Sequence, residues 1–266
     1  MRGLRAAIGF LTVLPAAPQT PTAGLSKAAA WFPVVGLLLG VAVAVLDGLL
    51  TWLGLRDGVS LLLDGVLLVA VLALLTRGLH LDGFMDACDA LAGGHNRERR
   101  LEILRDPHVG AFGVVAVVLL LLSKVSALAA LPGESRLWTI VLVPCLARWA
   151  ILVVMYRFPY VRQQGLGTPF LRGGGRRNLI AGSAVALLAT VILTGPVGLL
   201  LALAAGLVAW AVGAWARRRI GGVTGDVYGA ACETSEAVVL ALAVVLTQRD
   251  AGALVSPLLA LLGLSV

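Results

Sequence analysis

Six long apolar runs dominate this sequence and restrict the folds open to it. Each approaches the roughly 20 residues that a helix needs to cross a bilayer. Hydrophobic residues make up 59% of the 266 positions and charged residues only 13%, about half the charged share of a typical soluble domain. The runs are 31–53, 59–76, 110–131, 137–156, 178–194 and 196–216. We therefore expect an all-α, polytopic membrane helix bundle.

A shorter run, about 234–247, predicts a seventh transmembrane helix with room to extend back toward Asp226. The tail 253–264 is apolar but interrupted by Pro257, which predicts a further short or interfacial piece. No loop between the runs is long enough for a separate soluble domain. We expect one integral-membrane domain over residues 1–266.

The N-terminal segment, 1–30, has two arginines and a short apolar run that ends at Pro15 and Pro18. The run from Ala6 to Leu14 is at the short end for the apolar part of a signal peptide. We predict an interfacial or re-entrant segment here instead.

Lysines and arginines are distributed unevenly over the loops between the runs. Loops on one side carry 16 of the 21, whereas the other side has only Arg56, Arg136 and Arg249. The positive-inside rule places the cation-rich side in the cytoplasm. The net charge of +7 is then largely a result of topology, so it gives no reason to expect nucleic-acid binding. The lipid bilayer is the partner that this pattern implies.

Four charged residues lie within the runs, where each is costly at bilayer depth. They are Asp47, Asp64, Lys124 and Arg148. One interpretation is pairing between helices that fixes the bundle. The other is that Lys124 or Arg148 lines a polar cavity for substrate, and a transporter or channel would use such residues.

The cytoplasmic segment 77–109 contains the densest group of acidic residues. Asp82, Asp86 and Asp89 are spaced at i, i+4 and i+7, so a helix would place all three on one face. Two unit charges about 5 Å apart repel by roughly 3 kcal/mol at an effective dielectric near 20. Three carboxylates on one face therefore favour a bound divalent cation, and Mg²⁺ holding a phosphate is the common case.

The rest of this segment predicts a second helix. Gly93 and Gly94 end the first helix, and Asn96 is a suitable N-cap for a helix over 97–105. His108 lies just before the next span, as either a ligand contact or a cap.

Two further cytoplasmic segments have residues suited to the same site. In 157–170, Arg157 and Arg162 accompany a turn at Gly165–Gly167, and arginines beside flexible backbone suit phosphate capture. In 221–233, Asp226 heads a helix and Glu233 follows at i+7. For Asp226 we leave open favourable helix-dipole chemistry and a metal or substrate role.

Four motifs together resemble the adenosylcobinamide-GDP ribazoletransferase family, the membrane-bound cobalamin synthases. They are HLDGFMDACDALAGG, RERRLEILRDPHVGAFG, RFPYVRQQGLG and GGVTGDVYGA. The resemblance covers most of the chain. Two departures are small: Ala90 replaces the usual glycine after the third aspartate, and Arg105 replaces the usual lysine before Asp106.

The resemblance implies the last step of cobalamin assembly, in a bacterial cytoplasmic (inner) membrane with the active-site loops facing the cytoplasm. α-Ribazole or its 5′-phosphate attacks the phosphorus joined to the cobinamide arm of adenosylcobinamide-GDP, and GMP leaves. The cofactor implied is Mg²⁺. The oligomeric state stays open, a homo-oligomer included.

The resemblance also implies roles for particular residues. We expect Asp82 and Asp86 to bind Mg²⁺ with Asp226 as a further ligand. Asp89, grouped with these metal ligands, is the expected base for the ribazole hydroxyl. The residues expected to bind the phosphate-bearing substrate are His80, Arg99, Arg100, Arg105, Arg157 and Arg162.

A CDP-alcohol phosphotransferase is the alternative enzyme. That family also places aspartates on membrane helices, in a D-x-x-D-G-x-x-A-R pattern followed by G-x-x-x-D-x-x-x-D. Here Gly83 follows Asp82, but Met85 and Asp86 stand where Ala-Arg belongs, and the later aspartate pair is absent. A transporter is less favoured, because transport sites tend to lie near the bilayer midplane, whereas the acidic cluster lies at a surface.

Overall fold

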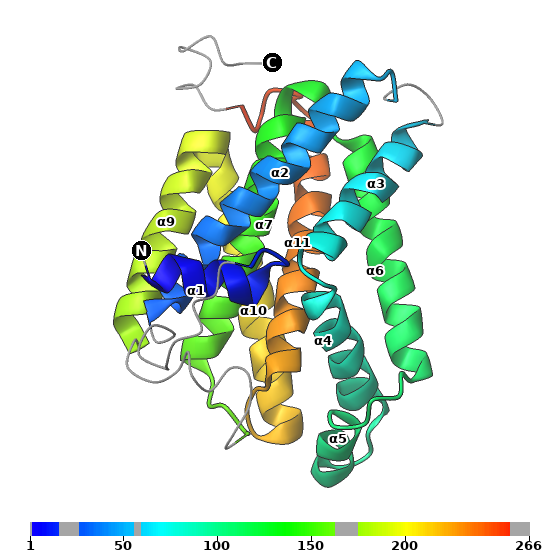
Figure 1. Cartoon of the computed structure of the whole chain (residues 1–266), viewed down its shortest axis with the longest axis vertical. Coiled ribbons are helices and arrows are strands. Elements are labelled where there is room, and N and C mark those ends of the chain that lie inside the picture. Colours follow the sequence, from blue (N-terminus) through cyan, green and yellow to red (C-terminus); the bar gives the residue numbers. More distant parts are fainter. Residues whose placement is uncertain (1, 16–26, 56–59, 163–174, 256–266) are drawn as a thin grey trace.

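The computed structural model describes residues 2–15, 27–55, 60–162 and 175–255, and this part is helical almost throughout (Figure 1). Its elements in chain order are α1 (Arg2–Leu11), η2 (Ala29–Trp31), α2 (Phe32–Trp52), α3 (Ser60–Leu75), α4 (Leu79–Cys88), η3 (Asp89–Gly93), α5 (Arg97–Ile103), α6 (Ala111–Ala130), α7 (Gly133–Arg157), α9 (Gly175–Thr194), η4 (Pro196–Gly198), α10 (Leu199–Ile220) and α11 (Gly225–Thr247). No β-strand forms in these ranges, although an isolated parallel bridge joins Tyr160 to Val223.

Six helices in the described ranges are long and apolar enough to cross a membrane. They are α2 with η2, α6, α7, α9, α10 with η4, and α11. The seventh predicted helix is confirmed, and α11 does extend back past Asp226. The chain is therefore a polytopic membrane helix bundle, as the apolar runs predicted.

The predicted span 59–76 differs from the others, because α3 is short and passes the same test only together with α4. The two helices meet at a bend of 95°. Arg77 and Gly78 both have positive φ, 55° and 66°, and two consecutive left-handed residues cannot continue an α-helix. The end of α1 secures this bend: Val13 N donates to Leu75 O at 2.8 Å, and Arg77 Nη2 donates to Val13 O at 3.2 Å.

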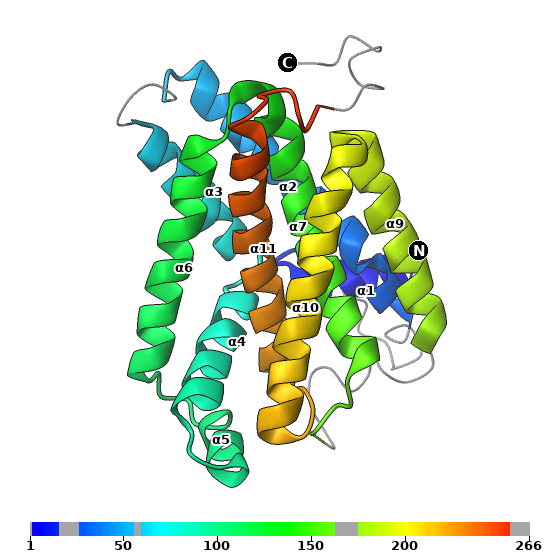
Figure 2. The ribbon, with the colours of Figure 1, turned by 180° about the vertical axis from the view of Figure 1, so that it is seen from behind.

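The long helices form a bundle with α7 and α11 in the middle (Figures 1 and 2). The pair α3 and α6 lies on one side of this centre, and α9 and α10 lie on the other. The contact between α2 and α7 is made by backbone: a Cβ on Gly36 would lie 2.3 Å from Pro144 O, and one on Gly40 would lie 2.3 Å from Val141 O. Such small-residue contacts are typical of packing between membrane helices.

Arg136 corrects the predicted topology. It was assigned to a loop on the cation-poor side, but α7 begins at Gly133 and Arg136 is only 1% exposed. Its Nη2 lies 2.7 Å from Asp47 Oδ1, and the same atom pairs with Asp64. The guanidinium therefore joins α2, α3 and α7 within the bundle.

A second buried cluster joins α6, α7 and α11. Lys124 Nζ lies 2.6 Å from Glu236 Oε2 and also pairs with Glu233, and Arg148 pairs with Glu236. All four side chains are buried. Lys124 and Arg148 therefore form the interhelical pairs that one interpretation predicted. Lys124 and both glutamates also line a mainly apolar cavity, so the second interpretation, a polar cavity for substrate, stays a prediction.

The N-terminal helix α1 lies across the long helices (Figure 1). Ala7 and Leu11 are buried against the bundle, whereas Arg2 and Arg5 are exposed. This arrangement is typical of an interfacial helix, and the interfacial position of α1 stays a prediction. The rest of that prediction, 16–26, lies outside the described residues, as does nearly all of the predicted tail piece 253–264.

Candidate active site

The candidate site begins where α4 crosses α11 at two glycines. A Cβ on Gly83 would lie 3.0 Å from Asp226 Cα, and one on Gly229 would lie 2.7 Å from His80 O. Any side chain at either position would force the two backbones apart. This close crossing brings Asp82 on α4 and Asp226 on α11 to one pocket.

A short backbone pairing positions the arginine of the site. Val161 N donates to Val223 O at 2.9 Å, and Val223 N donates to Pro159 O at 2.8 Å. Gly222 permits this approach, because a Cβ there would lie 2.2 Å from Pro159 O. The pairing aligns the end of RFPYVR with the start of GGVTGD, so Arg162 and Asp226 face each other.

Arg162 and Asp226 form the one ion pair among the described pocket residues. Arg162 Nη2 lies 2.9 Å from Asp226 Oδ2 and donates to Leu104 O at 2.7 Å. Thr224 Oγ1 also donates to Asp226 Oδ2, at 3.0 Å. Asp226 lies in the first turn of α11, where the helix dipole favours a negative charge. Its other carboxylate oxygen, Oδ1, has no hydrogen bond to these partners.

The pocket encloses about 720 Å³ of empty space, part of it open to solvent. One part of its wall is polar, with Asp82, Asp226, Arg162 and His80. The other part is apolar and mainly aromatic. Its larger side chains are Phe10, Phe32, Leu79, Ile151, Met155, Tyr160 and Tyr228.

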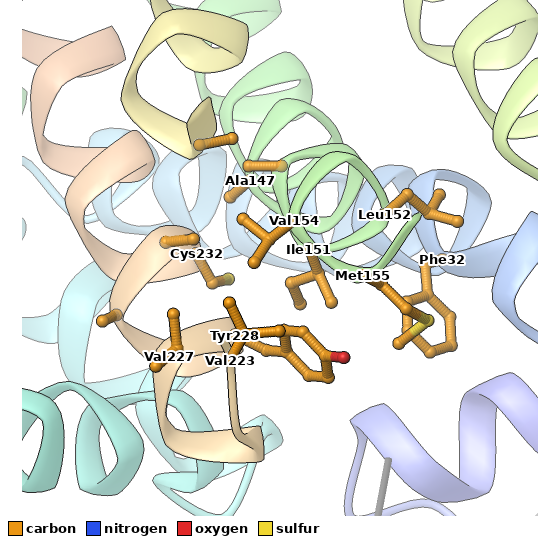
Figure 3. Packing of buried hydrophobic residues seen from close by; sticks show 14 of the residues in the cluster. Phe32, Ala147, Ile151, Leu152, Val154, Met155, Val223, Val227, Tyr228 and Cys232 are labelled. Atoms are coloured by element: carbon orange, nitrogen blue, oxygen red, sulfur yellow. The ribbon is translucent and has the colours of Figure 1, made fainter. Parts of the chain in front are cut away.

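Two pairs of rings form the aromatic part of the wall. Tyr160 and Tyr228 stack with their centroids 6.0 Å apart, as do Phe10 and Phe32. Figure 3 shows the Tyr228 ring extending from α11 toward Met155 and Phe32, beside Ile151 of α7. A ligand here would meet charge on one side and flat apolar surface on the other.

Negative charge exceeds positive charge at the polar wall. Asp82 is exposed and Asp86 is half-buried, and the charges of Asp82 and Asp226 both act on Asp86. Asp82, Asp226 and Arg162 line the pocket with a formal charge of −1, and Asp86, which does not line it, brings the group to −2. Within the described ranges, no group of three or more His, Cys, Asp or Glu side chains is already placed to hold a metal ion.

Asp89 has a different environment from Asp82 and Asp86. It is 8% exposed, and its two oxygens accept the backbone N–H groups of Gly110 and Gly113, each at 2.8 Å. These groups belong to the N-terminus of α6, so Asp89 caps that helix from another element. The expected role of Asp89 as base or metal ligand stays a prediction: its oxygens face the start of α6, and Asp89 does not line the pocket.

Helix α5 is confirmed, with Asn96 Oδ1 accepting from Arg99 N at 2.8 Å. Its arginines do not converge on the pocket. Arg97 Nε donates to Ile220 O at 3.0 Å, and the buried Arg100 reaches Arg219 O at 3.5 Å. Both side chains therefore meet carbonyls at the C-terminus of α10, where cations are favourable.

The other expected phosphate-binding arginines are exposed. Arg99 pairs with Glu102 at 2.9 Å on the surface of α5, and Arg105 and Arg157 are also exposed. Of the expected arginines only Arg162 lines the pocket in the described part of the chain. The turn at Gly165–Gly167 lies outside the described residues.

His80 lies between the pocket and the interior of the bundle. It lines the pocket and is 3% exposed. The charges of Arg148, Glu236 and Lys124 also act on it. His80 therefore lies near both the pocket and the buried ion pairs.

His108 acts locally as a partner of Asp106. Its backbone N–H donates to Asp106 Oδ1 at 3.0 Å, and its Nδ1 lies 2.6 Å from the same oxygen. These two contacts hold the pKa of Asp106 below its usual value. The caps of the adjacent helix ends are Leu104 and Gly110, so His108 is not a cap here, and its role as a ligand contact stays a prediction.

Sequence reasoning missed Thr224 and the four rings. Tyr160 lies in RFPYVR and Tyr228 in GGVTGDVY, both recognised as site segments. The two tyrosine rings come together because Val161 pairs with Val223. A single backbone pairing of this kind produces no repeating pattern of residues that could be recognised in either segment. Phe10 and Phe32 are common apolar residues whose position at the pocket depends on how α1 crosses α2.

The fold and the pocket define the class: a multi-pass membrane protein with a pocket lined by carboxylates, one arginine and aromatic rings. Comparison with protein families gives the particular family. Residues 3–244 match the model of the cobalamin-5-phosphate synthase family, and the chain belongs to that family.

Relatives agree with this assignment along nearly their whole length. A protein of Synechococcus sp. named adenosylcobinamide-GDP ribazoletransferase is 42% identical over 243 residues, which is 89% of this chain and 93% of the relative. Proteins of the same name from Syntrophobacter fumaroxidans and Roseiflexus sp. are 40% and 39% identical, covering 96% and 86% of their own lengths and 89% and 88% of this chain. No solved structure matches the chain.

Proposed function

We propose that this protein is an adenosylcobinamide-GDP ribazoletransferase. It transfers the cobinamide-phosphate group of adenosylcobinamide-GDP to α-ribazole or α-ribazole 5′-phosphate and releases GMP, which is the last step of cobalamin nucleotide-loop assembly. Family membership and the names of the relatives support the reaction. The structural observation that carries it is the pocket in which Asp82, Asp226 and Arg162 lie beside aromatic rings.

Arg162 is the residue that binds the diphosphate. A guanidinium matches two phosphate oxygens at once, and Arg162 is half-buried at the pocket wall. In the structure its partner is Asp226 at 2.9 Å. Phosphate oxygens would compete for the same guanidinium, so substrate binding would release Asp226 from this pair.

The reaction forms one P–O bond and breaks another. The ribazole hydroxyl oxygen attacks the phosphorus attached to the cobinamide arm, the bond from that phosphorus to GMP breaks, and the hydroxyl proton goes to a base. We do not propose Asp89 as that base, because both of its oxygens accept backbone N–H bonds at the start of α6 and it does not line the pocket. We assign proton acceptance to Asp82 or Asp226, which line the pocket, or to Asp86 beside them.

Mg²⁺ is the cofactor that we propose for the site. Mg²⁺ is commonly held by one or two carboxylates together with substrate phosphates and water. Asp82 and Asp226 in the pocket, with Asp86 beside them, offer oxygen donors of that kind. The ion would neutralise charge on the diphosphate and on the leaving phosphate.

We also propose that the pocket faces the cytoplasm, in a bacterial inner membrane. The support is the distribution of cations, with 16 in the loops on the pocket side. The burial of Arg136 in α7 strengthens this argument, because only Arg56 and Arg249 then belong to the other side.

The test is turnover by the purified protein in detergent. Adenosylcobinamide-GDP and α-ribazole are supplied with and without Mg²⁺, and GMP and cobalamin are followed by chromatography. We expect both products in equal amounts, only with Mg²⁺. GMP release without Mg²⁺ would contradict the proposed requirement for Mg²⁺ but not the proposed reaction. No turnover, with CMP released from a CDP-alcohol and an acceptor, would overturn the reaction.

A further inference from the structure

A second hollow of the molecule lies on the outer surface, between the start of α2 and the start of α9. It encloses about 890 Å³ of empty space, part of it open to the surroundings. We call it the α2–α9 groove. The residues that line it are Lys27, Ala30, Trp31, Val34, Arg177, Asn178, Ala181 and Val185.

The groove has a cationic end and an apolar end. Lys27 precedes η2 and Arg177 is in the first turn of α9, so the two exposed cations lie at the cytoplasmic ends of neighbouring spans. Val34 and Val185 lie further along the same helices, in the membrane-spanning part. The polarity therefore changes along the bilayer normal, from charged to apolar.

No acidic residue is near in sequence to neutralise these cations. The chain has no aspartate or glutamate in 1–46 or in 135–225, and these ranges supply every residue that lines the groove. None of the ion pairs in the described part of the chain involves Lys27 or Arg177. The positive-inside rule accounts for cations on this side, but not for two of them at the mouth of one apolar hollow.

The surrounding packing holds the groove open. Trp31 is 37% exposed and is fixed against α1, where a Cβ on Gly3 would lie 3.2 Å from its ring. On the other side, α9 packs against α7 at Gly182, where a Cβ would lie 2.7 Å from Leu152 Cδ1. A tryptophan at this depth is typical of the headgroup level of a bilayer.

We propose that the α2–α9 groove binds one anionic phospholipid. Lys27 and Arg177 bind the phosphate of the headgroup, Trp31 lies at the level of the glycerol, and Val34, Ala181 and Val185 contact an acyl chain. Basic pockets between membrane helices on the cytoplasmic side are suited to this class of lipid. The site is additional to the reaction pocket, and the adjacent residues Trp31 and Phe32 separate the two, one lining each.

The experiment is a lipid titration of the delipidated protein, followed by native mass spectrometry. The probes are dioleoyl phosphatidylglycerol and dioleoyl phosphatidylcholine, which differ in headgroup charge but not in acyl chains. We expect one phosphatidylglycerol to bind in preference. Lys27→Gln/Arg177→Gln should weaken that binding by about thirty-fold, the effect expected for two interfacial cations, and leave phosphatidylcholine binding unchanged.

Two further variants separate the groove from general charge and from misfolding. Arg217→Gln/Arg218→Gln removes two exposed cations from the end of α10 and should keep the wild-type preference. Ala181→Trp fills the groove without changing charge and should also lower phosphatidylglycerol retention, while the unfolding temperature without lipid stays that of the wild type.

Three results would overturn the proposal. One is equal retention of the two lipids by the wild-type protein. Another is retained preference in Lys27→Gln/Arg177→Gln. The third is full displacement of the lipid by inorganic phosphate, which would identify a site for a free anion.

Discussion

Two groups of charged side chains in this protein differ in how well they are matched. Inside the bundle, Lys124 and Arg148 are paired with two glutamates, and the formal charge of the cluster is zero. At the pocket, in the described part of the chain, Arg162 pairs with Asp226 alone, Asp82 and Asp86 lie nearby without a cation of their own, and the formal charge of these four residues is −2. The first group is buried, whereas the second is partly exposed.

The difference separates charges that fix the fold from charges that are available for chemistry. A buried ion pair is costly to break, because removal of one partner leaves the other unpaired in a medium of low dielectric. A partly exposed excess of carboxylates instead favours cations, and with Arg162 it suits a phosphate-bearing ligand. The same residue types thus have separate roles, and substitution should tell them apart.

The largest effect should follow from breaking the interior cluster. Lys124→Met leaves Glu233 and Glu236 with one cation, and we expect the free energy of unfolding to fall by about 3–5 kcal/mol. Thermal unfolding in detergent measures this loss. The double variant Lys124→Met/Glu233→Gln restores neutrality and should recover part of it. An unchanged unfolding temperature in Lys124→Met would show that the cluster does not hold the helices together.

Substitution at the pocket should remove activity and not stability. We expect Asp82→Asn and Asp86→Asn each to lower turnover by about a hundredfold, since metal and phosphate contacts supply several kcal/mol of transition-state stabilisation. GMP release measures turnover, and the unfolding temperature should stay unchanged. Glu98→Gln, an equal change of charge on the exposed face of α5, is the control. Full activity in both aspartate variants would contradict the site.

Asp89 should behave like the interior charges, although it is close in sequence to the pocket aspartates. Loss of its cap on α6 in Asp89→Ala should cost about 1–2 kcal/mol of stability. Asp89→Asn retains one acceptor oxygen and should keep the pH dependence of kcat. A catalytic base would instead alter that pH profile, and a changed profile in Asp89→Asn would restore the role predicted from sequence.

The smallest effect should come from the surface of α5. Arg99 forms an exposed pair with Glu102, and Arg99→Ala should change stability by only about 0.2–1 kcal/mol. Arg100→Ala, which removes a buried guanidinium from the end of α10, should cost more. Neither variant should raise KM for the GDP-bearing substrate, and a raised KM for either would place that arginine at the phosphates.

The helices were predictable from sequence, because hydropathy and caps are local signals. Apolar runs gave the spans, and Asn96 gave the start of α5. The bend between α3 and α4 was missed because it depends on the backbone of Arg77 and Gly78. Arg136 was placed in a loop because a search for apolar runs ends a run at the first charged residue. The sequence does not show that two aspartates on other helices neutralise this charge.

The site was predictable in part. The spacing of Asp82 and Asp86 and the glycines before Asp226 pointed to the right segments. The spacing that grouped Asp89 with them could not reveal the amides of Gly110 and Gly113. Likewise, both Arg100 and Arg162 lie in charged loop segments that suit phosphate binding. Only the folded positions of α10 and α11 show that Arg100 contacts the end of α10 and that Arg162 lines the pocket.

The charges of α11 also have a consequence for how the protein is made. The helix carries Glu233 and Glu236 among its apolar residues, and a charged residue at the centre of a membrane helix costs about 2.5–3.5 kcal/mol on insertion. Its cationic partners on α6 and α7 leave the ribosome earlier. Insertion of α11 is therefore favourable only beside helices already in the bilayer, so the bundle and the pocket would be completed together, late in synthesis.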